Sequence, residues 1–284
     1  LRHQKMKKGS HETFYRLSRE GVWPWFEKIG TRVVGQWQIV HPDGKDTPDY
    51  DEGYRLARYA SYDHWVATRD AVPLGGNGPD YEKNNEALRK RSEYLLGSDR
   101  VFYLQGHMAP GGPYYLPATD EDFEIVDDDS AGQENAPRPV RNDIALPGQE
   151  IVTLRQWKIK KGTFEEFHRA SVTGVWPYFE KIGARVVGQW KVVFPPISDE
   201  VESDEYDEVV MMTRYASYEH WQATRNAIDL GGDGGDYDAL REAFKFRRSV
   251  TLSTSLDFMQ GYMYHSPPKY LPSLKERYRR TSGQ

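Results

Sequence analysis

The chain has 284 residues and no cysteine, which excludes disulfides, thiolate nucleophiles and cysteine-ligated zinc sites but leaves the compartment open. No stretch approaches 18 consecutive apolar residues, so we expect no membrane-spanning helix. Positive charge is not in excess either. The 38 Lys and Arg residues stand against 43 Asp and Glu, and no basic run occurs, so we expect no nucleic-acid partner.

The short motifs of common catalytic sites are also missing. The chain contains no G-x-S-x-G, phosphate-binding loop, H-E-x-x-H or dinucleotide-binding pattern. We therefore expect neither a metal nor a diffusible cofactor. Any activity would have to come from side chains alone.

What the sequence does have is a duplication. Residues 1–42 return as residues 154–195 with about 27 of 42 positions identical, and matching blocks continue to the end of both copies. Two long copies do not make a solenoid, which needs at least three shorter units. We predict two duplicated domains, arranged like a covalent homodimer about a pseudo-two-fold axis. Further homo-oligomerisation remains open.

The predicted domain boundaries follow from composition. We expect a first domain over residues 1–117, an acidic, proline-containing linker over 118–150, a second domain over 151–272 and a basic C-terminal tail over 273–284. The chain opens in what looks like the middle of a strand, because the counterpart of Leu1 in copy two is preceded by residues 149–153, so we expect further sequence upstream of Leu1. A cytoplasmic location is our expectation, and periplasmic or secreted locations stay open for that reason.

Each copy predicts the order β-α-β-β-α-β. The first helix should kink or break at Gly21 and Pro24, and at their counterparts Gly174 and Pro177. Such an order is typical of the ferredoxin-like arrangement, an α+β fold with helices on one face of an antiparallel sheet. Two of these sheets meeting face to face would form an α/β barrel within one chain.

Local signals predict how several helices begin. Thr163 with Glu166 reads as a capping box, and Ser61 and Ser217 as N-caps. The glycine-rich loops Gly75–Asp80 and Gly231–Asp236 match half of a calcium-binding repeat. That repeat binds ions only between stacked turns, so we favour structural loops with Asp80 and Asp236 as N-caps and leave a weakly bound ion open.

Several short blocks resemble the NIPSNAP family. They are Leu-Arg-x-Trp-x-Ile-Lys-x-Gly at 154–162, Phe-Glu-Lys-Ile-Gly, Val-Val-Gly-Gln-Trp and Arg-Tyr-Ala-Ser-Tyr-x-His-Trp, the last three in both copies. The resemblance implies the dimeric α/β-barrel superfamily of ferredoxin-like folds, here as a tandem duplication. It implies no single reaction, since relatives include cofactor-free monooxygenases, cyclases, isomerases and haem enzymes. The acidic linker, the glycine-rich insertion and the unequal loops after Pro42 and Pro195 depart from the family pattern.

Histidines present in only one copy are the first candidates for chemistry. His41 and His107 lie at strand ends where copy two has Phe194 and Tyr262. Histidine transfers protons near neutral pH, so we predict catalytic roles for both. The alternative is an exposed histidine at a strand end. His64 and His220, found in both copies, are predicted to be structural.

Arginines and aromatic residues form the second group of candidates. Arg58 and Arg214 lie on the third strand of each copy, followed by Tyr59 and Tyr215, and Trp37 and Trp190 lie on the second strand. If they face the cleft between sheet and helices, each copy offers a guanidinium beside an indole. We predict a catalytic role for Arg58, acting with His41 and His107, and ligand binding by the other five. The alternative is pairing of these arginines with buried acids.

Three functions are consistent with these patterns. The first is binding of a small aromatic or carboxylate-bearing metabolite, with cofactor-independent catalysis as an open question. The second is a non-catalytic scaffold that binds a protein through its acidic segments, at residues 120–129 and 199–208. The third is haem binding by a pocket histidine. In the first case we expect the more polar pocket in copy one, because His41 and His107 occur only there.

Overall fold

The computed structural model describes residues 1–44, 48–108, 123–127, 150–263 and 276–280. The chain divides into two compact units. The first unit comprises Leu1–Leu104, Val193–Glu200 and Met259–Pro267, and the second comprises Gln105–Val192, Val201–Phe258 and Pro268–Gln284. Each unit therefore holds the body of one repeat and receives a strand end from the other repeat.

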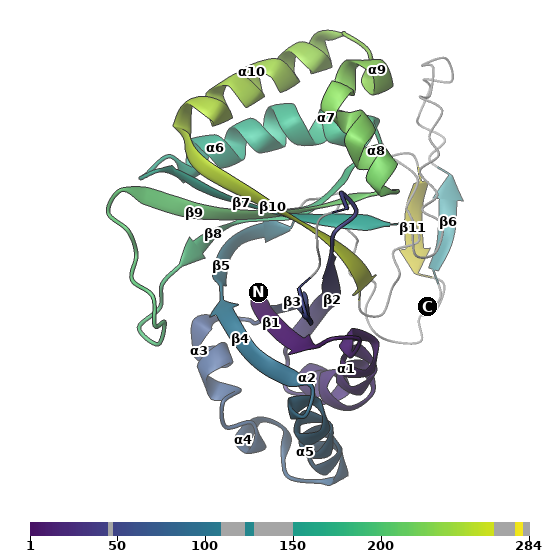
Figure 1. The fold of residues 1–284 in the computed structure, drawn as a ribbon, viewed down its shortest axis with the longest axis vertical. Helices are drawn as coiled ribbons and strands as arrows, with labels where there is room; N and C mark the ends of the chain where they lie inside the picture. The colour runs from purple at the N-terminus through teal and green to yellow at the C-terminus, as the bar shows by residue number, and fades with distance from the viewer. Residues whose placement is uncertain (45–47, 109–122, 128–149, 264–275, 281–284) are drawn as a thin grey trace. The chain divides into compact units, whose positions relative to one another are not determined.

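The first repeat has the predicted order of elements (Figure 1). The elements are β1 (Arg2–Lys7), α1 (His11–Leu17), the π-helical turn η1 (Ser18–Val22), α2 (Trp23–Lys28), β2 (Arg32–Val40), β3 (Tyr50–Arg58), α3 (Tyr62–Ala67), α4 (Val72–Gly75), α5 (Pro79–Ser92), β4 (Leu95–Val101) and β5 (Tyr103–Met108).

The second repeat follows the same order. It contains β7 (Ile151–Lys160), α6 (Phe164–Ala170), η2 (Ser171–Val175), α7 (Trp176–Lys181), β8 (Arg185–Val193), β9 (Tyr206–Tyr215), α8 (Tyr218–Ala223), η3 (Thr224–Asn226), α9 (Ala227–Gly231), α10 (Gly235–Val250) and β10 (Thr251–Met263). The prediction of two α+β repeats of the β-α-β-β-α-β type is confirmed. The barrel, in which two sheets face each other, stays a prediction.

Most of the predicted linker 118–150 and tail 273–284 lies outside the described residues. Within them, β6 (Phe123–Asp127) and β11 (Glu276–Arg280) pair as antiparallel strands. The predicted domain boundaries remain a prediction. None of the helices in the described part of the chain has the length and apolar character that crossing a bilayer requires.

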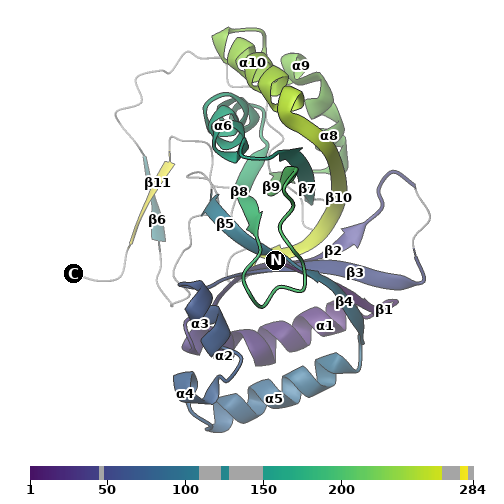
Figure 2. The same ribbon diagram turned by 90° about the vertical axis from the view of Figure 1, so that its left-hand side faces the viewer.

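In the first unit the strands lie in the order β4-β1-β3-β2, and the end of β10 lies next to β2. Helices α1, α2 and α5 cover one face of this sheet (Figure 2). The core between them contains residues from both layers, namely Tyr15, Val22, Trp23, Val33 and Ala87, with Phe26 and Ala57 beside them.

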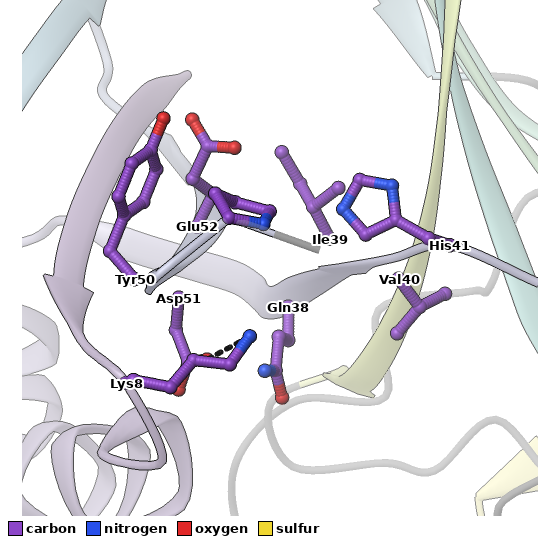
Figure 3. Close-up of a pocket in the computed structure, with 9 residues that line it drawn as sticks. Lys8, Gln38, Ile39, Val40, His41, Tyr50, Asp51 and Glu52 are labelled. Atoms are coloured by element: carbon purple, nitrogen blue, oxygen red, sulfur yellow. Dashed lines mark ion pairs between the residues drawn. The ribbon is translucent and has the colours of Figure 1, made fainter. Parts of the chain in front are cut away.

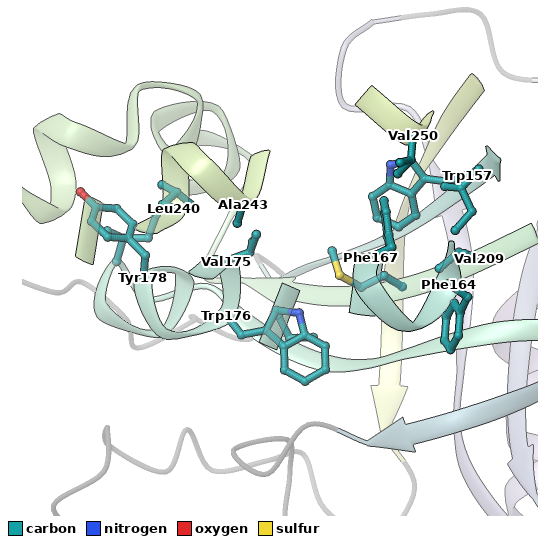
Figure 4. Packing of buried hydrophobic residues seen from close by; sticks show 14 residues of the cluster. Trp157, Phe164, Phe167, Val175, Trp176, Tyr178, Val209, Leu240, Ala243 and Val250 are labelled. Atoms are coloured by element: carbon teal, nitrogen blue, oxygen red, sulfur yellow. The ribbon is translucent and has the colours of Figure 1, made fainter. Parts of the chain in front are cut away.

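The second unit repeats this design with β7, β9 and β8 covered by α6, α7 and α10. Figure 4 shows Phe167 of α6 and Tyr178 of α7 among the buried side chains of its core. The end of β5 lies next to β8. Both units therefore place an apolar layer between one sheet face and the helices.

The predicted break in the first helix is confirmed and takes the form of a π-helical turn. Pro24 and Pro177 each lie at the start of the helix that follows the turn. Proline has no N–H to continue the preceding hydrogen-bond ladder but fits the first turn of a new helix. The chain therefore changes its helical register just before each proline.

The helix-start predictions have mixed outcomes. The Ser61 and Ser217 caps are confirmed, because their hydroxyls accept from the His64 and His220 amides at 3.0 and 3.1 Å. The capping box is wrong, since the Thr163 hydroxyl donates backwards to the Lys160 carbonyl at 2.7 Å.

The proposed aspartate caps are wrong too. Gly78 and Gly234 occupy the N-cap positions, and the first-turn carboxylates of Asp80 and Asp236 instead pair with Lys28 of α2 and Lys181 of α7. The two glycines already provide the extended backbone of an N-cap, so the aspartates lie two residues later, in the first turn.

Glycine at the π-helical turn lets α5 approach closely. A Cβ at Gly21 would lie 2.3 Å from the Cβ of Ala87, far inside van der Waals contact. We expect Gly21→Ala to lower the free energy of unfolding by about 1–3 kcal/mol through overpacking, measured by urea denaturation. Adding Ala87→Gly should recover part of the loss. Gly97→Ala, where a Cβ meets nothing within 4 Å, is the control, and an equal loss there would contradict this account.

Candidate functional site

A row of polar residues crosses the helix-covered face of the first unit's sheet. Gln36 on β2 lies directly opposite Arg55 on β3, and Arg55 lies directly opposite Arg2 on β1. Directly opposite residues on antiparallel strands have Cα atoms about 4.5–5.5 Å apart and point to the same face. That face is the covered one, because the Arg55 guanidinium lies 5.6 Å from the Phe26 ring of α2.

Helix α5, which covers the sheet, adds a third arginine, Arg91. Its buried positions Asn84, Ala87 and Arg91 share one face at helical spacing, and Arg91 is only 3% exposed. The Arg91 guanidinium lies 4.3 Å from the centre of the Phe14 ring of α1. The covered layer of the first unit therefore holds three arginine side chains among aromatic rings.

Among the described residues no carboxylate neutralises this cluster. Of the ion pairs found among the described residues, none involves Arg2, Arg55 or Arg91. Burial lowers the pKa of Arg55 to about 10; Tyr59 opposes this shift and the charge of Arg2 adds to it. Burial, Arg55 and Arg2 together lower the pKa of Arg91 well below its ordinary value. Both guanidinium groups remain charged at neutral pH, so the cluster carries uncompensated positive charge.

Several polar atoms of the cluster lack hydrogen bonds. Five atoms are buried without a hydrogen-bond partner among the described residues, namely Arg55 Nε, Arg91 Nε, Arg91 Nη1 and both amide atoms of Gln36. An unmade hydrogen bond of a buried polar group costs about 1–3 kcal/mol, and more for a charged group. Proteins normally provide such groups with a partner, which can be an ordered water or a ligand. The buried atoms without hydrogen bonds and the arginines without ion pairs therefore lie in the same layer, between the sheet and the helices of the first unit.

The second unit has the same row with one decisive change. Gln189, Met211 and Arg155 lie opposite one another, so Met211 stands in the place of Arg55. The Gln189 amide has partners at both ends: His168 Nδ1 lies 3.0 Å from its oxygen and the Met211 sulfur 3.9 Å from its nitrogen. Arg247, the counterpart of Arg91, lies 4.4 Å from the Phe167 ring and 4.9 Å from the Trp157 ring.

The predicted pairing of Trp37 with Arg58 in the covered cleft is wrong. Trp37 and Arg58 lie on the sheet face opposite to Arg55, because side chains alternate along a strand and Trp37 pairs with Tyr54. Trp37 is fully buried, whereas Arg58 is exposed at the end of β3. The arginine of β3 that faces the helices is Arg55.

The same correction holds in the second unit. Trp190 pairs with Val210, and Arg214 lies on that same face, away from the helices. Arg214 is buried and pairs with Glu150 through Nε at 2.9 Å and through a second contact from its Nη2. This bidentate pair gives Arg214 a structural partner. Ligand-binding roles for Trp37, Trp190 and Arg214 stay predictions.

His41 and Arg58 do not share a site. The antiparallel register places Arg58 opposite Arg32, at the start of β2, whereas His41 follows the end of that nine-residue strand. His41 instead lines a cavity of about 170 Å³ together with Lys8, Tyr50 and Asp51 (Figure 3). Lys8 and Asp51 pair with each other at 3.6 Å. The predicted cooperation of His41 with Arg58 is therefore wrong.

His107 lies in the part of β5 that belongs to the second unit, and its side chain lies outside the described residues. Arg58 belongs to the first unit. Within the first unit His41 and Arg58 lie toward opposite ends of the β2–β3 pair, and the catalytic roles of His41, His107 and Arg58 stay predictions. Differences between the two copies at single positions could not reveal that the end of β5 belongs to the second unit.

Tyr59 and Tyr215 lie close to the polar rows. The interaction between Tyr59 and Arg55 places Tyr59 beside the arginine cluster. Burial raises the pKa of Tyr215 to about 12, with Arg155 opposing the shift. Each tyrosine also makes an edge-on ring contact at 5.9 Å with the histidine of the following helix. Their ligand-binding roles remain predictions.

Those two histidines serve the fold. His64 Nδ1 accepts the Ala60 amide at 3.1 Å, and Nε2 lies 2.8 Å from the Ile29 carbonyl. His220 repeats both contacts with Ala216 and Ile182. Because Nδ1 accepts, Nε2 carries the proton and donates. Among the described residues no cluster of three or more His, Asp or Glu side chains could hold a metal ion.

The sequence contained a signal for the arginine cluster. Arg55 stands on the third strand where copy two has Met211. Because side chains alternate along a strand, Arg55 points to the opposite face of the sheet from the exposed Arg58. Comparing the copies at every inward position, not only at histidines, would have identified Arg55. Arg91 was not recognisable in this way, because copy two also has an arginine there.

Comparisons with known proteins show only distant likeness. No family model matches the chain, and no curated protein matches it either. A solved structure from Lactobacillus acidophilus, described as a candidate monooxygenase, has a TM-score of 0.48 and 10% identity over 92% of both chains. A NIPSNAP family protein from Agrobacterium tumefaciens has a TM-score of 0.30 and 16% identity over 39% of this chain and 91% of its own.

A NIPSNAP-like domain protein from Burkholderia xenovorans has a TM-score of 0.26 and 19% identity, covering 42% of this chain and 90% of its own. Likeness at this level leaves the activity of the present chain undetermined. The case for a function must therefore come from the chain's own residues.

The two arginines at the ends of β3 and β9 should behave differently. We expect Arg214→Met to lower the free energy of unfolding by about 3 kcal/mol, because it leaves the Glu150 carboxylate without its buried partner. The matched Arg58→Met should cost less than about 1 kcal/mol, since Arg58 is exposed. Urea denaturation of both variants tests this. Equal losses, or a larger loss for Arg58, would contradict the structural role of Arg214.

Proposed function

We propose that the first unit binds a small organic acid between its sheet and helices. The observation that supports this is the cluster of the buried Arg55 and Arg91 with the half-buried Arg2, which has no acidic partner in the described part of the chain. A buried charge without a counter-ion is strongly destabilising, and a ligand carboxylate would remove that penalty.

The geometry of guanidinium groups suits a carboxylate. Each presents N–H donors in a planar fork that can bind two oxygens at once. Arg55 Nε together with Arg91 Nε and Nη1 supplies three unused donors from two elements. A carboxylate between them would accept hydrogen bonds from the strand below and the helix above.

Aromatic rings surround the charged groups and favour an apolar or aromatic body for the ligand. Phe14 lies against Arg91 and Phe26 against Arg55, and Trp23 and Tyr15 belong to the adjoining core. Ligand sites are mostly apolar with a few well-placed polar groups, and the surroundings of Arg55 and Arg91 have this composition. Guanidinium groups that hold a carboxylate can also stabilise negative charge that develops on an enolate, so the site is suited to cofactor-independent chemistry as well.

The scaffold alternative receives less support. In the acidic segment 199–208, Glu200 pairs with Arg100, Glu202 with Lys161, and Asp207 with Lys161 and Lys191. These three carboxylates already have partners within the chain. Most of the other acidic segment, 120–129, lies outside the described residues.

Isothermal titration with phenylacetate tests the proposal directly. We expect the protein to bind phenylacetate but not the neutral phenylacetamide, and Arg55→Met to weaken binding at least about tenfold, because it removes a charged donor at the carboxylate. Methionine is the matched replacement, since Met211 fills this position in the second unit.

Stability separates binding from folding in the same variants. Arg55→Met should leave the free energy of unfolding unchanged or raise it by about 1–3 kcal/mol, because it removes an uncompensated buried charge. Arg247→Met, which removes the arginine between Phe167 and Trp157 in the second unit, should leave phenylacetate binding intact. Absence of phenylacetate binding, or equal binding by the Arg55→Met variant, would overturn the proposed function.

A further inference from the structure

Gln36 has a buried polar atom that a bound carboxylate cannot satisfy. It is 2% exposed, and neither its amide nitrogen nor its amide oxygen has a hydrogen-bond partner. Three buried donors of the arginines can be satisfied by a carboxylate alone. The amide oxygen of Gln36 cannot, because a carboxylate has no hydrogen to donate.

The second unit shows that a glutamine at this position is not orphaned by the fold itself. Gln189 lies at the same place in its row, and its oxygen and nitrogen contact His168 and Met211. The first unit has Tyr15 and Arg55 where the second has His168 and Met211. Gln189 thus has hydrogen-bond partners within its unit, whereas Gln36 at the equivalent position has none among the described residues.

We infer that the ligand of the first unit is a 2-hydroxy acid, with a hydroxyl on the carbon next to its carboxylate. This rests on the proposed function, since it assigns a second polar group to the ligand of that site. Gln36 and Arg55 lie directly opposite each other, so a group that reaches Gln36 must be close to the carboxylate held by Arg55.

Hydrogen bonding accounts for each orphaned atom of the row. The carboxylate oxygens accept from Arg55 Nε, from Arg91 and from the Gln36 amide nitrogen. The neighbouring hydroxyl donates to the Gln36 amide oxygen. No bond is formed or broken covalently, and exchanging the amide oxygen and nitrogen would not affect the argument, because both are orphaned.

Three related probes separate the hydroxyl from the carboxylate. Phenylacetate has the carboxylate only, mandelate adds a 2-hydroxyl, and α-methoxyphenylacetate keeps the oxygen but cannot donate. We expect one enantiomer of mandelate to bind at least about tenfold more tightly than phenylacetate, because a site that hydrogen-bonds a hydroxyl rejects the analogue without it. The methoxy acid should bind no more tightly than phenylacetate.

Variants of the two glutamines complete the test. Gln36→Leu should abolish the preference for mandelate while still binding phenylacetate, and Gln189→Leu should leave the preference unchanged. A thermal melt of each variant shows whether it folds; we expect Gln36→Leu to melt no lower than the unmodified protein, and Gln36→Met serves as a second replacement.

The outcomes distinguish this inference from the proposal beneath it. Phenylacetate binding that depends on Arg55 without any mandelate preference would overturn the hydroxy-acid assignment and leave the carboxylate site standing. A mandelate preference that survives Gln36→Leu and Gln36→Met would also overturn the assignment. Absence of binding by both acids would overturn the carboxylate site and the assignment together.

Discussion

The stability of the layer between the sheet and the helices of the first unit depends on how the positive charge buried in it is compensated. Arg55 and Arg91 are buried, lie close enough to Arg2 for its charge to act on both, and have no acid beside them in the part of the chain that the structure describes. Like charges in a medium of low dielectric constant repel strongly, and cation–π contacts with Phe14 and Phe26 recover only about 0.5–2 kcal/mol each. A bound anion is the simplest partner that would balance this arrangement. The stability of the fold and the affinity for a ligand are thus coupled at one place.

The duplication provides an internal comparison for this conclusion. In both repeats a glutamine and an arginine flank a central residue on the neighbouring strand, which is Arg55 of β3 in the first repeat. A helix that carries another arginine covers each row. In the second repeat the central residue is Met211, and Gln189 contacts His168. The glutamine of the second row therefore has partners within the chain, whereas the first row has orphaned atoms and one more buried arginine among the described residues. The difference arises from two substitutions on a shared backbone plan, which is why ligand binding is assigned to the first repeat alone.

Much of the fold could be predicted from the sequence because local rules decide it. Proline at the start of α2 and α7 and serine before α3 and α8 each have one strong structural preference, and each was confirmed. The site was predicted less well. The sequence pointed to arginine on the third strand but to Arg58 rather than Arg55. Strand register and facing decide between two arginines three residues apart, and a bulge between Val33 and Gly35 shifts that register in β2. Charge compensation depends on pairings across elements, such as Arg214 with Glu150, that no local pattern reveals.

Anomalous diffraction from crystals of the protein with 4-bromomandelate tests the central claim most directly. The account predicts a bromine peak in the layer between the sheet and the helices of the first unit, with the carboxylate bonded to Arg55 and Arg91 and the hydroxyl to Gln36. A layer that contains only ordered water at these side chains, with the bromine bound elsewhere, for example in the cavity beside His41, would contradict it.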